Sequence, residues 1–240
     1  WQLVPTTLLA QADSCIGSKS SINVGDAKNI VGTFYPPTKI YIDQNFLQTL
    51  HQNEIHSGIG EILKVHAIDS AESFNRVASS LSAMTKDLDA LQPFIYSALT
   101  IKKRYIEVDE FDEGIRNIFN FGHSFGHAIE SATNFGVPHG VAVTMGMDVA
   151  CQIAASRNLL PSNESTRMRT ALKKNYQTFA HVPIPLDASM NALLKDKKNS
   201  STELGLILPV GEQAKIEKVM IPPNEEFVDQ FRHALGAIAQ

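Results

Sequence analysis

Apolar residues recur at spacings of three and four along most of the chain after residue 43, which is the period of a helix with one buried face. Stretches with this pattern cover residues 44–68, 71–88, 90–107, 115–135, 139–158, 163–175 and 224–239. Asp43 stands in position for an N-cap, and Pro161 and the prolines at 183 and 185 mark helix ends. The pattern therefore predicts a mainly helical protein from residue 43 onward.

The first 42 residues have a different character. "WQLV" at 1–4 and "TKIYID" at 38–43 have the composition of strands, and the Gly, Ser and Asn residues of 17–29 predict a loop between them. Two more short strands are predicted near the C-terminus, at 205–210 and 215–221. We therefore expect an α/β remnant over residues 1–42 and a mostly helical domain over residues 43–240.

Composition narrows the class of protein. With 43% hydrophobic residues among 240, the chain can bury a substantial core. A net charge of -4 argues against non-specific nucleic-acid binding, and no apolar run reaches the roughly 18 residues that span a bilayer. Two cysteines without CxxC spacing favour a reducing cytoplasm. The sequence opens inside a strand pattern without an initiator Met, so we expect a piece of a longer chain.

The stretch "GHSFGH" at 122–127 carries two histidines four residues apart, which a helix places on one face. His139 precedes the next apolar helix, where a loop can return it toward this pair, and Glu61 is an acid within an apolar stretch. Two or three imidazoles and a carboxylate are the ligand set of a catalytic zinc site, and a remaining histidine can transfer protons. By spacing alone, hydrogen-bonded core histidines fit equally well.

Two polar segments suggest an acidic ligand. The loop at 17–29 and the residues just before it offer groups that bind phosphate or carboxylate, although a solvated loop has the same composition. Upstream of the histidines, spacings of four, three and four place Arg116, Asn120, His123 and His127 on one face of a predicted helix, as in a cleft wall. "KDKKN" at 195–199 is by default a solvated turn. The candidate binding groups of the first loop are Asp13, Lys19, Asn23, Lys28 and Asn29.

Together these segments resemble 3-dehydroquinate synthase and the related sugar-phosphate cyclases. The resemblance runs in order through "VPTTLLAQADSCIGSKSSIN", "AKNIVGTFYPP", "GIGEILKV", "DEFDEGIRNIFNFGHSFGHAIE", "HGVAVTMGM" and "DKKNSSTELGLILP". It implies the multi-helical C-terminal domain of the dehydroquinate synthase-like fold, preceded by the tail of an α/β NAD-binding domain. It also implies a cytoplasmic, homodimeric, NAD- and zinc- (or cobalt-) dependent lyase of the shikimate pathway.

The resemblance assigns roles to individual residues. The metal ligands would be Glu61, His123 and His139. Proton transfer would fall to His127 and to Asp112, where the family usually has glutamate, with Lys64 as a further catalytic group. Substrate contacts would come from Asp13, Lys19, Asn29, Lys64, Lys102, Arg116, Asn120 and Lys197. The NAD site would be lined by Thr6, Thr7, Lys28, Phe46 and Thr49.

The implied reaction explains these residue types. The substrate, 3-deoxy-D-arabino-heptulosonate 7-phosphate, would be oxidised transiently by NAD beside a metal that polarises its hydroxyls, would lose phosphate by elimination, and would close to 3-dehydroquinate by an aldol step. Lysines and an arginine would balance its carboxylate and phosphate. Nucleic acids and membranes are not expected partners.

Three departures from the family pattern and three alternatives remain. The family's Gly-rich NAD-binding half is absent from this sequence, so we expect no turnover by this chain alone. "GGK" is "GSK" at 17–19, and "HGE" is "HGV" at 139–141, which removes a carboxylate beside a metal ligand. The alternatives are another cyclase, such as a 2-epi-5-epi-valiolone or 2-deoxy-scyllo-inosose synthase, a dehydrogenase of the glycerol dehydrogenase type, and a non-catalytic metal-binding fragment.

Overall fold

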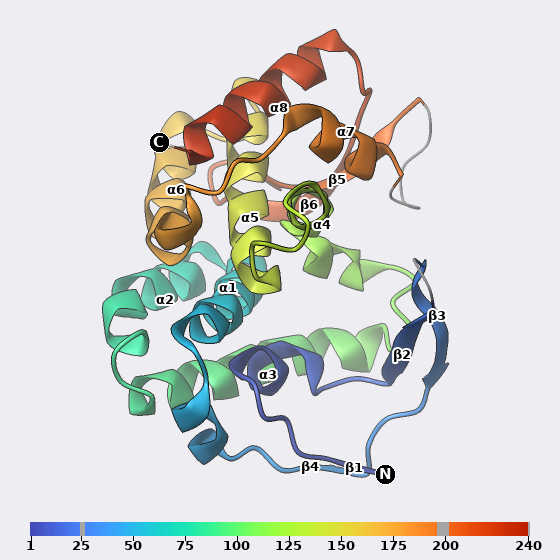
Figure 1. Cartoon of the computed structure of the whole chain (residues 1–240), viewed down its shortest axis with the longest axis vertical. Coiled ribbons are helices and arrows are strands. Elements are labelled where there is room, and N and C mark those ends of the chain that lie inside the picture. Colours follow the sequence, from blue (N-terminus) through green and yellow to red (C-terminus); the bar gives the residue numbers. More distant parts are fainter. Residues whose placement is uncertain (25–26, 196–201, 240) are drawn as a thin grey trace.

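The structure is a computed structural model that describes residues 1–24, 27–195 and 202–239, apart from the side chains of residues 23 and 27–30. Helices make up most of it (Figure 1). The described helices are α1 (Gln52–Asp69), α2 (Ala71–Met84), α3 (Gln92–Val108), α4 (His123–Ala132), α5 (His139–Ser156), α6 (Ser162–Tyr176), α7 (Leu186–Leu194) and α8 (Glu225–Ile238). Shorter helical turns are η1 (Ala10–Ser14), η2 (Gln44–Thr49), η3 (Asp89–Leu91), η4 (Ile115–Asn120) and η5 (Gln177–Phe179).

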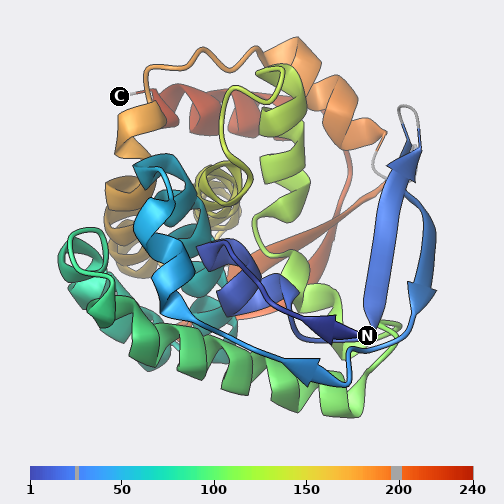
Figure 2. The ribbon, with the colours of Figure 1, turned by 60° about the horizontal axis from the view of Figure 1, so that its bottom comes forward.

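Helix α5 is the centre of the molecule. Every residue from 140 to 151 is buried, and a helix that is apolar on all sides needs neighbours on all sides. Helices α1, α4, α6 and α8 and strand β5 pack around it, as the two views of the ribbon show (Figures 1 and 2). No described helix has the length and hydropathy to cross a bilayer.

The six short strands of the described residues form three pairs. The parallel pair joins β1 (Gln2–Leu3) to β4 (Lys39–Ile40), so the beginning and the end of the segment 1–42 lie side by side (Figure 2). The antiparallel pairs join β2 (Lys19–Val24) to β3 (Ala27–Phe34) and β5 (Leu204–Val210) to β6 (Lys215–Ile221). The predicted strands at both ends of the chain are thus confirmed.

The predicted loop at 17–29 is wrong, because this segment forms most of the β2–β3 hairpin, with Lys19 opposite Phe34 and Ile22 opposite Val31. Ser20, Ser21 and Ile22 in succession are exposed, so the strand has no buried face to mark it with alternating polarity. The strand can be recognised only from its pairing with β3 in the structure.

The helical segments are largely confirmed, with three differences. The stretch 44–68 divides into η2, which Asp43 caps through Asn45 N, and α1, because Leu50 is extended. The stretch 115–135 is not one helix: it breaks at Gly122, whose φ of +76° lies in the left-handed region. Helix α7 was not predicted at all. Its single buried turn, with Ser189 and Leu193 as the buried residues, is too short to show a period.

Candidate metal centre

Three helices bring an acid and three imidazoles together. Glu61 lies in α1, His123 and His127 in α4, and His139 is the first residue of α5. Glu61 Oε1 lies 3.8 Å from His123 Nε2 and 3.5 Å from His139 Nε2. Two ligands bound at about 2.1 Å with tetrahedral angles would be about 3.4 Å apart, so these spacings suit a shared ion.

The three imidazoles form a second overlapping set of donors. One ring nitrogen from each of His123, His127 and His139 can be chosen so that the three nitrogens lie within 4.8 Å of one another. The His123 ring centroid lies 5.4 Å from that of His127 and 5.3 Å from that of His139. Because Glu61 Oε1 faces His123 and His139 at ligand spacing, we take this carboxylate with these two histidines as the better ion site and His127 as their neighbour.

Glu61 is a buried carboxylate whose Oε1 atom faces the imidazoles. The residue is 1% exposed, and among the described residues its Oε1 accepts no hydrogen bond. Burial alone would raise its pKa, but the charge of Lys64 and the approach of the His139 imidazole bring the pKa well below its usual value. The carboxylate is therefore ionised, and together with the two imidazoles beside it this buried anion forms a candidate cation site.

Close contact between two helices sets the Glu61–His139 distance. A Cβ added to Gly60 would lie 2.0 Å from the Gly140 carbonyl oxygen, and one on Gly140 would lie 1.8 Å from that of Ser57. In the same crossing, Gly140 N donates to Ser57 Oγ at 2.9 Å. Glycine at both positions therefore lets α1 and α5 touch backbone to backbone beside the candidate ligands.

The two imidazoles differ in charge. Burial and the nearby Lys64 ammonium hold the pKa of His123 well below its usual value, so His123 is neutral at pH 7. Burial would also lower the pKa of His139, but the hydrogen bond to Glu130 and the nearby Glu61 carboxylate raise it to about 9. A metal ion takes imidazole only in the neutral form, so ion binding here would displace a proton from His139.

A chain of alternating charges leads away from Glu61. Lys64 Nζ lies 2.5 Å from Glu61 Oε2 and 3.0 Å from Asp13 Oδ2, and Lys102 Nζ lies 2.6 Å from Asp13 Oδ1. Lys64 is 2% exposed, and its pKa is raised by the two carboxylates although burial alone would lower it. The predicted substrate residues Asp13, Lys64 and Lys102 are thus brought together next to the candidate ion site.

The other predicted substrate residues take different positions. Lys19 pairs with Asp112 at 2.7 Å, an ion pair between the hairpin and the segment before η4. Arg116 is buried and donates to the carbonyls of Asp109 and Glu110, while Asn120 donates to the Asn117 carbonyl. The prediction that Arg116, Asn120, His123 and His127 share one helical face is wrong, because the chain turns at Gly122 between η4 and α4.

The residues expected to line an NAD site lie in the N-terminal segment. Thr6, Phe46 and Thr49 are exposed, and Thr7 Oγ1 accepts a hydrogen bond from Ala10 N at 3.2 Å. The Thr49 hydroxyl donates to the Phe46 carbonyl at 3.4 Å, and the NAD site stays a prediction. The remaining candidate groups lie outside the described residues or side chains: Asn23, Lys28, Asn29 and Lys197.

Sequence reasoning missed Glu130. Its Oε1 lies 3.2 Å from His139 Nδ1, and the residue is 6% exposed. The signal was present in the sequence, since Glu130 follows His123 by seven residues and therefore shares its helical face. The pairing with His139 on another helix could not be read from spacing.

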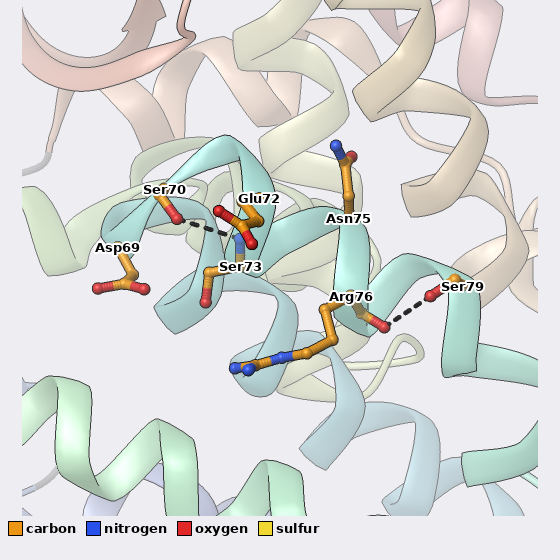
Figure 3. A pocket seen from close by; sticks show the side chains of 7 residues that line it. All are labelled: Asp69, Ser70, Glu72, Ser73, Asn75, Arg76 and Ser79. Carbon is orange, nitrogen blue, oxygen red and sulfur yellow. Dashed lines mark hydrogen bonds between the residues drawn. The ribbon is translucent and has the colours of Figure 1, made fainter.

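A separate hollow of about 630 Å³ lies between the end of α1 and the outer side of α2. Figure 3 shows two hydrogen bonds among its lining residues: Ser70 Oγ accepts from Ser73 N, and Ser79 Oγ donates to the Arg76 carbonyl. Asp69 is paired with Arg104 on α3. Among the described residues, the cluster of three possible metal donors lies at His123, His127 and His139 and not in this hollow.

Two family models match the chain, one described as 3-dehydroquinate synthase N-terminal over residues 1–57 and one as 3-dehydroquinate synthase C-terminal over residues 58–199. The 3-dehydroquinate synthase of Alkaliphilus metalliredigens is 36% identical over 229 residues, covering 92% of this chain and 63% of that protein. That of Enterococcus faecalis is 37% identical over 244 residues, covering 98% and 65%. The chain thus spans less than two thirds of the length of these relatives.

Solved structures of related cyclases share the fold. A 2-epi-5-epi-valiolone synthase from Streptomyces hygroscopicus with NAD⁺ and Zn²⁺ bound has a TM-score of 0.82 and 26% identity, over 100% of this chain and 66% of that one. A 2-deoxy-scyllo-inosose synthase complexed with carbaglucose-6-phosphate, NAD⁺ and Co²⁺ has a TM-score of 0.79 and 25% identity, over 97% and 66%. The fold class expected from the sequence is therefore confirmed.

Proposed function

The chain belongs to the 3-dehydroquinate synthase family, and from this membership we propose that it is the metal- and substrate-binding part of a 3-dehydroquinate synthase. The reaction would be the NAD-dependent cyclisation of 3-deoxy-D-arabino-heptulosonate 7-phosphate to 3-dehydroquinate with release of phosphate, a carbon–oxygen lyase step of the shikimate pathway. The observation that carries this proposal is the buried Glu61 carboxylate, which faces His123 and His139 and is held from behind by Lys64.

Zn²⁺ or Co²⁺ fits the donors of this site. Glu61 Oε1 and the Nε2 atoms of His123 and His139 would hold the ion, since one carboxylate and two imidazoles are a known zinc ligand set and Oε1 is buried without a hydrogen bond. The related cyclases named above were solved with Zn²⁺ or Co²⁺ and with NAD⁺, which supports the same two cofactors here. When bound, the ion would polarise substrate hydroxyls and NAD would accept and return a hydride.

The lysines beside Glu61 would bind the acidic groups of the substrate. An ammonium group has three N–H donors, and the described ion pairs of Lys64 account for two of them, with Asp13 and Glu61. Lys102, anchored on Asp13, adds a second positive charge, and Lys19 and Arg116 extend the set. Asp13 would keep both ammonium groups in place while Asn120 adds a neutral donor.

His127 and Asp112 would move protons around the bound substrate. The His127 ring centroid lies 5.4 Å from that of His123 and 5.7 Å from that of His139, close enough to reach a substrate bound at the ion. Asp112 is paired with Lys19, so its side chain is held near the hairpin. An imidazole with a pKa near neutrality accepts and returns a proton within one reaction cycle.

We further propose that residues 1–42 belong to the NAD-binding domain and residues 43–240 to the metal-binding domain. The exposed Thr6 and the short parallel β1–β4 pair, both within residues 1–42, support this division. A cytoplasmic homodimer is proposed on the resemblance to the family.

The test is metal binding and phosphate release. The 240-residue chain should bind about one Zn²⁺ or Co²⁺, and His123→Ala should remove it. The same chain, joined to the N-terminal third of the Enterococcus faecalis relative, should release phosphate from 3-deoxy-D-arabino-heptulosonate 7-phosphate. A metal-binding protein active only on sedoheptulose 7-phosphate would instead be a cyclase of the valiolone type. A folded chain that binds no metal would reject the site.

A further inference from the structure

We propose that Glu130 is the positioning residue that fixes the ring orientation and tautomer of His139 for metal binding, an inference that rests on the metal centre of the proposed function. Glu130 Oε1 lies 3.2 Å from His139 Nδ1, and Glu61 Oε1 lies 3.5 Å from the opposite ring nitrogen, Nε2. Imidazoles that bind metals commonly donate their second N–H to a carboxylate, which holds the ring and sets which nitrogen faces the ion.

The two carboxylates cannot exchange roles. The nitrogens of an imidazole point away from each other, so a carboxylate at Nδ1 lies outside the coordination shell of an ion at Nε2. Glu61 Oε1 approaches the Nε2 atoms of both His139 and His123, so a bound ion would lie on that side of the ring. Glu130 is therefore assigned to hold the ring from behind and not to be a further ligand.

The position of Glu130 follows from helix α4. His123, His127 and Glu130 stand at i, i+4 and i+7, so one helical face presents two imidazoles and, two turns from the first, the carboxylate. The carboxylate side chain is 7% exposed, so water competes little for the His139 contact. Helix α4 thereby supplies one proposed ligand directly and supports another.

The backbone of Glu130 also shapes the segment that returns His139 to the site. The Glu130 carbonyl accepts hydrogen bonds from Phe135 N at 2.8 Å and from Thr133 Oγ1 at 3.3 Å. These bonds close the turn after α4, which leads through Pro138 into α5. Side chain and main chain of one residue thus determine where the imidazole stands and how it is rotated.

This assignment answers the question raised by Val141. The family pattern has a carboxylate two residues after the histidine, whereas Val141 is fully buried among apolar neighbours and its side chain has no hydrogen-bonding group. Glu130, from the preceding helix, brings a carboxylate to the imidazole in this chain. The "HGV" sequence therefore does not leave His139 without outer support.

The experiment is a calorimetric titration of the chelator-treated 240-residue chain with Zn²⁺ and with Co²⁺. Glu130→Gln, which is close in size and removes the charge, should weaken binding about 10-fold, and Glu130→Ala about 100-fold, the range for lost outer support of a metal ligand. The visible absorption of bound Co²⁺ should also change, because it reports the geometry around the ion. Circular dichroism would confirm that each variant is folded.

Asp148→Asn is the matched control. Asp148 is another buried carboxylate, 1% exposed, but it accepts from Tyr176 and Arg169 on α6, away from the imidazoles. The Asp148→Asn substitution should lower the free energy of unfolding and leave metal affinity within about twofold of the parent chain, as expected of a purely structural contact.

Three results would overturn the inference. If both Glu130 variants keep the Zn²⁺ affinity and the Co²⁺ spectrum of the parent chain, the positioning role of Glu130 is rejected while the proposed metal centre stands. Equal loss of affinity in Asp148→Asn would show that general destabilisation explains the effect. No binding by the unsubstituted chain would reject the metal centre and this inference with it.

Discussion

The contact between α1 and α5 predicts that one methyl group will damage the candidate metal centre. Gly60 lies in the interior of α1 directly before Glu61, where helix propensity alone predicts that Gly60→Ala stabilises by about 1 kcal/mol. The structure predicts the opposite, because the new Cβ would lie 2.0 Å from the Gly140 carbonyl oxygen. The neighbour is backbone and cannot rotate away.

The size of the effect follows from the distances. Relief of the contact to 3.0 Å requires the helices to separate by at least 1.0 Å. Separation along the Glu61–His139 direction would lengthen the 3.5 Å spacing to about 4.5 Å, more than the roughly 4.2 Å that two bonds of about 2.1 Å can span. Because the blocking atom belongs to the backbone, we take the upper end of the overpacking cost of about 1–3 kcal/mol; after the propensity gain of about 1 kcal/mol, the expected net loss of unfolding free energy is near 2 kcal/mol. Metal affinity should fall at least about tenfold.

Urea unfolding and Zn²⁺ titration of the same preparations would measure both effects. Gly236→Ala in α8 is the matched control, because a Cβ there meets nothing within 4 Å and the substitution should stabilise by up to about 1 kcal/mol. The two substitutions should therefore move stability in opposite directions. A Gly60→Ala protein that is as stable as the parent and binds Zn²⁺ equally well would refute the reasoning.

Three further outcomes can be checked on the same chain. Lys64→Met leaves the buried carboxylates of Asp13 and Glu61 without the cation between them, so urea unfolding should show a loss of about 3–5 kcal/mol, and a loss below about 1 kcal/mol would contradict this. Burial raises the pKa of Cys15 to about 11, which lowers its thiolate fraction at pH 8 about a hundredfold, so it should react with a disulfide reagent only on unfolding; rapid labelling of the folded chain would oppose this. Burial lowers the pKa of His66, so the unfolded chain takes up a proton below about pH 6.5 that the folded chain resists, and stability should fall as the pH falls through that range; an equally steep fall in His66→Gln would assign it to other groups.

Local signals accounted for most of the helices. The apolar residues of a helix such as α5 recur at spacings of three and four, so a short stretch of sequence is enough to predict it. The helix predicted over 139–158 is observed as α5. Sequence patterns failed to predict structure that depends on contacts between separate segments of the chain. Strand β2 exists through its pairing with β3, and its exposed Ser20 and Ser21 read as a loop. The turn at Gly122 was hidden because glycine is compatible with a helix as well as with positive φ.

The sequence by itself determined which groups could bind a metal, since Glu61, His123 and His139 stand out as polar residues in apolar helical stretches. Only the tertiary structure decided that they meet, because Glu61 and His139 reach each other through a glycine-to-glycine helix crossing that no local pattern encodes. The same holds for Glu130 behind His139 and for Lys64 between two acids. The sequence specifies the chemistry of each side chain, whereas the distances between side chains from different helices depend on how the backbones of those helices pack.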